Sequence, residues 1–262
     1  MLKKNVTSIQ QQAKSDAFNT SISDLMAGML AVFILALCYF MINFGKVTEE
    51  REQALKKVTE SNKTRVVLLT NMETAINRVI DENKLQIDHI KADTSRGILP
   101  LPAGIFFESG KAEIKEEGKV IIRVLGQSLS EALEKKEFAD TVDTIFIEGH
   151  TDDVKMSEYS KFDTNWQLSS ERAYQTWKEL KAIYPDLEKK ENKNIVDGKG
   201  QPYFSCSGYA DTRPRPGTRV DDVKDSDEEK ARKRAINRRI DIRITMLPPT
   251  EDDLKDKGKT DK

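Results

Sequence analysis

An uninterrupted apolar segment from Leu25 to Ile42 constrains this chain more than any other feature. Its eighteen residues, LMAGMLAVFILALCYFMI, include no charge, no side-chain amide and no proline. At about 1.5 Å of rise per residue, a helix of this length nearly spans a hydrocarbon core of roughly 30 Å. A buried helix of a soluble protein would carry polar residues along one face, and this segment has none. The sequence therefore predicts a transmembrane helix, which we place at residues 21–44, behind a short tail at residues 1–20.

The segment is also longer than the apolar core of a cleaved signal peptide, which is about 7–15 residues and ends in small residues. Asn43-Phe44-Gly45-Lys46 offers no such cleavage site, so we expect an uncleaved signal-anchor. The flanking lysines and arginines are more numerous after the segment than before it. The positive-inside rule is weak for long translocated domains, so this count leaves the orientation open.

Average composition hides this segment and excludes several functions. The chain is 37% hydrophobic and 33% charged, and 43 Lys+Arg against 44 Asp+Glu give a net charge of −1. Such a balance argues against nucleic-acid binding by bulk positive charge. Two cysteines argue against a disulfide scaffold, and two histidines argue against a histidine-based metal site. We expect no metal and no cofactor.

Asp24 stands at the entrance of the apolar segment, in the sequence Ser21-Ile22-Ser23-Asp24-Leu25. One interpretation is a helix cap at the membrane interface, because serine and aspartate favour that position. The other is a carboxylate within the membrane, since Phe18 and Ile22 extend the apolar pattern upstream. Carboxylates inside membranes are costly and usually mark a path for ions or protons.

Residues 45–96 predict a helical rod. The segment contains no proline. Its eleven heptad positions are Leu55, Val58, Asn62, Arg65, Leu69, Met72, Ile76, Val79, Asn83, Gln86 and Ile90, and seven of them are apolar. This spacing favours a coiled coil, and asparagines on the heptad position of Leu55 and Leu69 favour a parallel homodimer. The alternative is a single helix that packs on its own domain.

A proline- and glycine-rich segment at residues 97–104 predicts a linker, and residues 105–247 predict an α+β domain. We expect strands at residues 105–107, 144–149, 203–206 and 240–246, and helices at residues 114–133 and 168–180. The resulting order, βαβαββ, is typical of helices packed on one sheet. The charged residues 248–262 predict a disordered tail.

Five motifs in this domain resemble the OmpA-like peptidoglycan-binding family. They occur in family order and cover nearly the whole domain: Phe107-x-Ser109-Gly110-x-Ala112, Glu148-Gly149-His150-Thr151-Asp152, Asn165-x-x-Leu168-Ser169-x-x-Arg172-Ala173, Gly208-Tyr209-Ala210-Asp211-x-x-Pro214 and Asn237-Arg238-Arg239-Ile240-Asp241-Ile242. The chain departs from the family in a longish charged loop after Asp152 and in a charged insertion at residues 218–234.

The resemblance implies a ligand, the peptidoglycan stem peptide held by its meso-diaminopimelate group. Asp152 would pair with the ammonium of that group. Arg172 would hold its carboxylate with a bidentate fork, aided by the helix dipole. Asn165 and Leu168 would complete the pocket. The alternative to ligand binding by Asp152 and Arg172 is a structural salt bridge between them.

Other interpretations of the polar residues are weaker. His150 with Asp152 and Asp153 lacks a second histidine or cysteine nearby for a metal site, and no nucleophile or oxyanion-hole signature accompanies it. We therefore expect no enzyme. The basic residues 232–239 are offset by acidic residues 221–229, which favours a structural or solvated role over direct nucleic-acid binding.

The whole order resembles the B subunit of MotB-like, proton-driven motors. The resemblance implies a single-pass protein of the bacterial inner membrane, with a cytoplasmic N-terminus and a periplasmic C-terminal domain. It also implies a MotA-like polytopic membrane subunit as partner, a B-subunit dimer, and Asp24 as the ion-carrying residue. Residues 21–33 resemble most the B subunit of Zorya antiphage defence systems, with a ZorA-like partner. A flagellar-type stator or a passive anchor between membrane and wall remains the alternative.

Overall fold

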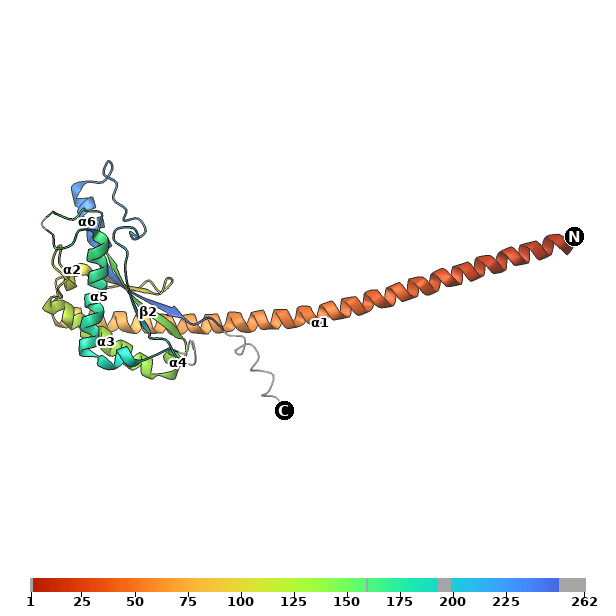
Figure 1. Cartoon of the computed structure of the whole chain (residues 1–262), viewed down its shortest axis with the longest axis horizontal. Coiled ribbons are helices and arrows are strands. Elements are labelled where there is room, and N and C mark those ends of the chain that lie inside the picture. Colours follow the sequence, from red (N-terminus) through yellow and green to blue (C-terminus); the bar gives the residue numbers. More distant parts are fainter. Residues whose placement is uncertain (1, 159, 193–198, 250–262) are drawn as a thin grey trace. The chain divides into compact units, whose positions relative to one another are not determined.

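The computed structural model describes residues 2–158, 160–192 and 199–249, with side chains from residue 20 onward. The chain divides into two units, residues 58–249 and the described helix of residues 2–57. The α+β fold expected from the sequence is confirmed, with a long apolar N-terminal helix followed by a four-stranded sheet and its helices (Figure 1).

The first helix, α1, spans Leu2–Glu82. It contains an 18-residue window with mean hydropathy 2.5, and none of that window is buried. By length and composition, this is the one helix among the described residues able to cross a membrane. The helix already includes the residues before Asp24, so Asp24 lies within α1 and does not cap its N-terminus.

The helical rod predicted for residues 45–96 is wrong from residue 83 on. The helix ends at Glu82, and Lys84 takes a positive φ of 49°. The chain then runs back along α1, where the side chain of Asn77 donates to the carbonyl of Ile90 at 2.9 Å and accepts from its amide at 2.8 Å. Residues 83–92 therefore belong to the folded domain.

The heptad residues after Arg65 are used by the same domain. Leu69, Met72 and Ile76 are 0% exposed and belong to one hydrophobic cluster with the sheet and the other helices. The alternative interpretation, a helix packed on its own domain, holds for this half of the pattern. The earlier positions Leu55 and Val58 are exposed, at 72% and 43%.

The sheet has the order β1-β4-β2-β3. Its strands are β1 (Ile98–Pro102), β2 (Val142–His150), β3 (Phe204–Gly208) and β4 (Arg239–Met246). β4 is antiparallel to both β1 and β2, and β2 is parallel to β3. Ile240, Ile242 and Ile244 alternate with polar residues along β4, so one face of the sheet is apolar and enters the core.

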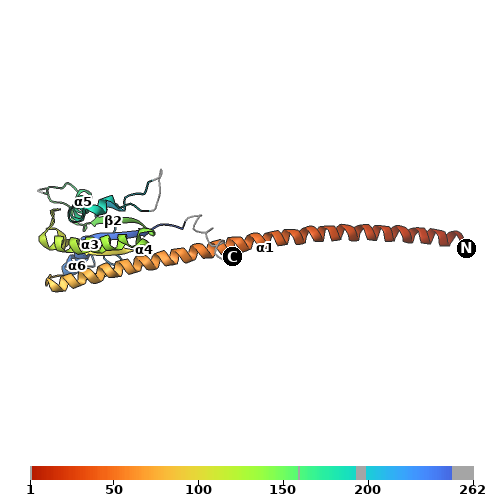
Figure 2. The same cartoon turned by 90° about the horizontal axis from the view of Figure 1, so that it is seen from below.

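The helices are α2 (Ala103–Phe106), α3 (Glu116–Glu134), α4 (Lys136–Ala139), α5 (Asn165–Ile183) and α6 (Asp227–Asn237), with a 3₁₀ turn η1 at Pro185–Lys189. α5 connects the parallel strands β2 and β3 and packs on both, and α3 packs beside it. Figure 2 shows α5, seen nearly end-on, next to β2.

Three further expectations are corrected. Residues 98–102, expected within a linker, form the edge strand β1. Residues 105–107, expected as a strand, lie largely in α2, because the chain turns into the core directly after Pro102. The charged insertion at residues 218–234 holds most of α6, which Ser226 caps by accepting from the amide of Glu229. The predicted tail falls, from residue 250 on, outside the described residues.

Candidate functional site

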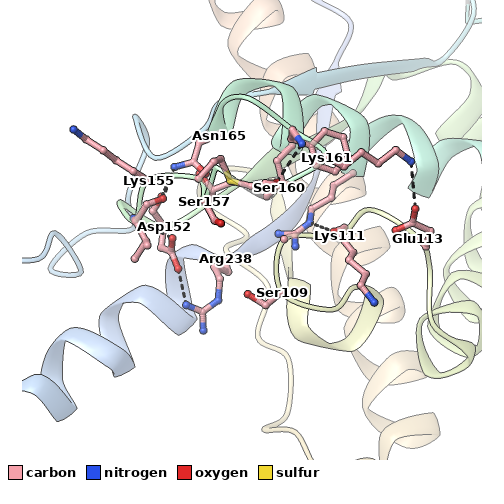
Figure 3. A pocket seen from close by; sticks show the side chains of 17 residues that line it. Ser109, Lys111, Glu113, Asp152, Lys155, Ser157, Ser160, Lys161, Asn165 and Arg238 are labelled. Carbon is pink, nitrogen blue, oxygen red and sulfur yellow. Dashed lines mark hydrogen bonds and ion pairs between the residues drawn. The ribbon is translucent and has the colours of Figure 1, made fainter.

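The four pocket residues expected from the sequence line one pocket at the start of α5. Asp152, Asn165, Leu168 and Arg172 border a cavity of about 810 Å³, within the usual range of roughly 300–1,000 Å³ for small-ligand sites (Figure 3). The loop after β2, the first turns of α5 and the loop at residues 109–113 form its walls. The motifs thus converge in space although they are distant in sequence.

Close packing of α5 on the sheet fixes this geometry. Gly149 of β2 packs directly against the backbone of Ser169 in α5. The approach is so close that a Cβ at position 149 would lie 2.0 Å from the carbonyl oxygen of Ser169. The hydroxyl of Ser169 in turn accepts from the amide of Ala210 at 3.0 Å. Thr164 caps α5 by accepting from the amide of Gln167. The first turn of α5 is therefore held against the ends of β2 and β3.

Asn165 shapes the loop that carries Asp152. Its side-chain amide donates to the carbonyl of Val154 at 2.9 Å and to that of Asp152 at 3.3 Å. These bonds bring the loop after β2 down onto the first turn of α5. The role of Asn165 visible in the structure is to position Asp152.

Arg172 is the most buried cation of the pocket, with 3% of its surface exposed. Its Nε donates to the carbonyl of Lys111 at 2.8 Å and its Nη2 to that of Glu108 at 3.0 Å, while the guanidinium lies over the ring of Phe107. Burial lowers the pKa of Arg172 to about 10, against an opposing effect of Asp152. The group is therefore still charged at neutral pH, and among the described residues no hydrogen-bond partner occupies its Nη1.

Two expectations about Arg172 need correction. It lies at the end of the second turn of α5, so the dipole at the helix start, which acts within the first turn, contributes little. It also forms no salt bridge with Asp152, so the salt-bridge alternative for that pair does not hold within the described residues. The carboxylate of Asp152 instead receives Nη1 of Arg238 at 2.6 Å (Figure 3).

Arg238, for which the sequence predicts a structural or solvated role, also lines the pocket. It follows directly after α6, and its neighbour Arg234 binds Asp153 through two contacts of 2.7 and 3.1 Å. The motif Asn237-Arg238-Arg239 contained the signal, but only the fold brings it to the loop after β2. α6 therefore holds this loop through two adjacent carboxylates.

Thr151 was also missed. Its side chain lines the pocket, is 3% exposed, and its hydroxyl is buried with no hydrogen-bond partner among the described residues. An unpartnered buried hydroxyl costs about 1–3 kcal/mol, which a ligand in the pocket would relieve.

Positive charge dominates the pocket. Its lining holds five cations against two carboxylates: Lys111, Lys155, Lys161, Arg172 and Arg238 against Glu113 and Asp152. The arrangement suits a ligand that carries more carboxylates than ammonium groups.

Comparison with known proteins gives one family match. Residues 106–201 match the OmpA family. A comparison with curated protein sequences finds no significant match.

Several solved structures are similar to the chain. A MotB-like protein from Desulfovibrio vulgaris is 19% identical with a TM-score of 0.46, over 71% of this chain and 96% of that one. The cell wall anchor of the type VI secretion system from Pseudomonas aeruginosa is 20% identical with a TM-score of 0.44, over 66% and 97%. The periplasmic domain of Helicobacter pylori MotB is 22% identical with a TM-score of 0.39, over 57% and 81%. In this chain, the segment that matches the OmpA family, residues 106–201, follows an apolar N-terminal helix.

Proposed function

We propose that this chain is the peptidoglycan-anchored B subunit of a proton-driven, MotA/MotB-type motor of the bacterial inner membrane. The observation that carries the proposal is the convergence of Asp152, Asn165, Leu168 and Arg172 on one cationic pocket of an OmpA-family domain. Peptidoglycan lies outside the inner membrane, so the domain would be periplasmic and the N-terminus cytoplasmic. The function is binding and anchoring rather than catalysis.

The pocket offers one group for each charge of meso-diaminopimelate. The unoccupied Nη1 of Arg172 would receive the carboxylate, whose negative charge would offset the cost of burying this guanidinium. Asp152 would receive the ammonium in place of Arg238. The exchange keeps the Asp152 carboxylate paired with a cation, and the guanidinium of Arg238, which is 43% exposed, would turn to solvent.

Binding of the full-length, detergent-solubilised protein to purified sacculi tests the pocket. Arg172→Ala should lower the retained fraction by about tenfold or more, since it removes a charge-assisted contact worth roughly 1.5–3 kcal/mol. Arg123→Ala, which removes an exposed arginine of α3, is the matched control. If sacculi retain a folded Arg172→Ala variant as well as the wild type, the proposed binding of meso-diaminopimelate by Arg172 is refuted.

Asp24 would be the ion carrier. Its neutral form moves easily through a low-dielectric path, and its carboxylate would dock on groups of a MotA-like polytopic partner. Asp24→Asn keeps the shape of the side chain but removes its titration. It should abolish phage protection or motility while leaving sacculus binding intact. Retained function in this variant would leave only a passive anchor between membrane and wall.

We further propose the Zorya-type subtype, with a ZorA-like partner. The support is the sequence of residues 21–33, and a neighbouring gene for a multi-span A-type subunit together with lost phage protection on deletion would test it. The parallel homodimer also remains a proposal. Its helical contact would be limited to α1 before the buried part of the pattern, where Leu55 and Val58 are exposed.

A further inference from the structure

A second cavity lies on the sheet face opposite α5. Ile147 and Gly149 of β2 face the core and α5, whereas Glu148 and His150 point to the other side, as strand alternation requires. Together with Asp241 of β4, these two side chains line a cavity of about 190 Å³. The volume is below the roughly 300 Å³ of the smallest usual organic-ligand sites, so it suits a small ion.

Five arginines surround this cavity: Arg96, Arg213, Arg215, Arg239 and Arg243. Arg243 donates to Glu148 at 3.0 and 2.5 Å, and Arg239 donates to Asp241 at 3.0 and 2.9 Å. Both carboxylates of the cavity are therefore already neutralised by arginine.

The remaining arginines leave an excess of positive charge. Arg96 is paired with Asp93 just outside the cavity, at 2.7 Å. Within the described residues, no carboxylate pairs with Arg213 or Arg215. Arg213 rests on the ring of Tyr209, 3.6 Å from its centroid, which holds the guanidinium in place without compensating its charge. Two positive charges thus face a small cavity without a counter-charge.

His150 adds an unsatisfied group. It is 2% exposed and its ring stacks on Tyr209 with centroids 5.4 Å apart. Its Nε2 lies 3.3 Å from a carboxylate oxygen of Asp241, but neither ring nitrogen makes a hydrogen bond among the described residues. Buried polar atoms are rarely left in this state, so a ligand in the cavity is the natural partner.

We propose that this cavity binds a small oxyanion, phosphate or sulfate, held by Arg213, Arg215 and an N–H of His150. Guanidinium groups are well suited to tetrahedral oxyanions, and a buried imidazole N–H supplies a directed donor. The ion would come free from solution or as a phosphate group attached to a larger molecule. The proposal is independent of the proposed peptidoglycan pocket, which is lined by Thr151 and Asp152 and not by Glu148 or His150.

A divalent cation is the rival occupant. Ligand atoms of Glu148, His150 and Asp241 lie within 4.8 Å of one another, as a metal site would require. Both carboxylates, however, hold arginines, which a cation would have to displace from a cavity that already carries excess positive charge. The charge balance therefore favours the anion.

Isothermal titration of the full-length, solubilised chain with inorganic phosphate, and with sulfate at equal ionic strength, tests the proposal. We expect one site, with affinity at least about tenfold weaker in Arg215→Ala and in His150→Gln. Arg219→Ala removes an exposed arginine four residues further along and should bind as the wild type does. Fluorescence of the two tryptophans, both in α5, identifies variants that remain folded.

The outcomes separate cleanly. No phosphate or sulfate binding to the wild type, or equal binding by folded Arg215→Ala, would overturn the proposal. Stoichiometric zinc binding that Glu148→Gln removes, with phosphate inert, would replace the anion by a metal. Dimethyl phosphate distinguishes the two sources: binding as tight as that of inorganic phosphate supports an attached phosphate group, and weaker binding supports the free ion.

Discussion

Replacing Ile76 by alanine tests whether α1 is part of the folded domain. Ile76 is 0% exposed and lies in the hydrophobic cluster of residues 58–249. Removing a fully buried isoleucine side chain costs about 2–5 kcal/mol, because the transfer free energy is lost and a cavity remains. At about 2–4 °C per kcal/mol for a domain of 150–250 residues, a loss of about 3 kcal/mol lowers the melting temperature by about 6–12 °C.

Leu55→Ala is the matched comparison, since Leu55 shares the heptad pattern but is 72% exposed. Substitutions at exposed positions usually change stability by less than about 0.5 kcal/mol, so we expect a shift of under about 2 °C. Thermal unfolding is followed by tryptophan fluorescence, because Trp166 and Trp177, the two tryptophans of the chain, both lie in α5 and report the domain alone.

The comparison distinguishes two physical origins of one sequence pattern. If both variants lose the same stability, and the loss depends on protein concentration, the whole heptad pattern forms an intermolecular coiled coil. That result would refute the packing of the second half of α1 on its own domain.

Two further substitutions probe local geometry. Gly149→Ala should destabilise the domain by about 1–3 kcal/mol or more in chemical denaturation, because the new Cβ would lie 2.0 Å from the carbonyl oxygen of Ser169. Gly104→Ala is the control and should be nearly silent, because no atom lies within 4 Å of the new Cβ. Equal effects of the two substitutions would contradict the close approach of α5 to β2. Hydrogen bonds from Ser95 and from Arg96 hold the pKa of Asp93 at about 2, below its ordinary 3.8, so its stabilising effect is present above pH 3.8 and is lost as the pH falls towards 2. Asp93→Asn should therefore reduce the loss of unfolding free energy between about pH 4 and 2. The same pH dependence in the variant and the wild type would contradict the stabilising role of the Asp93 carboxylate.

Strand periodicity predicted most of the sheet, and the exception has a physical reason. Alternation located β2 and β4 to within a few residues. β1 was assigned to a linker because Pro100 and Pro102 stand within it. β4 is its one neighbouring strand in the sheet among the described residues, and an edge strand tolerates residues that cannot donate a backbone hydrogen bond. Whether a strand lies at an edge depends on the complete topology, which local sequence does not contain.

The heptad pattern shows a related limit. Apolar spacing states that one side of a helix is covered, but it does not state what covers it. Val79 and Ile80 lie on the side of α1 that packs in the domain core, whereas Leu55 is exposed. The difference comes from which part of α1 the rest of the domain covers, and no residue of the helix encodes that by itself.

Motifs located the pocket, but not its internal pairing. Asp152 and Arg172 were expected to face one ligand, and both line the pocket. The partner of Asp152 is Arg238, 86 residues away in sequence. Such a pairing depends on the ends of β2 and α6 meeting in space, so spacing along the chain gives no measure of it.

The segment Glu148-Gly149-His150-Thr151-Asp152 serves two cavities through the simple alternation of a strand and its exit. Glu148 and His150 line the smaller cavity, while Thr151 and Asp152 line the larger one. Neighbouring residues of one motif therefore belong to two separate cavities. Under the two proposals made above, a relative that binds only in the smaller cavity would retain Glu148 and His150 and vary at Thr151 and Asp152. The pattern of substitution within five residues would then report which of the two cavities each relative still uses.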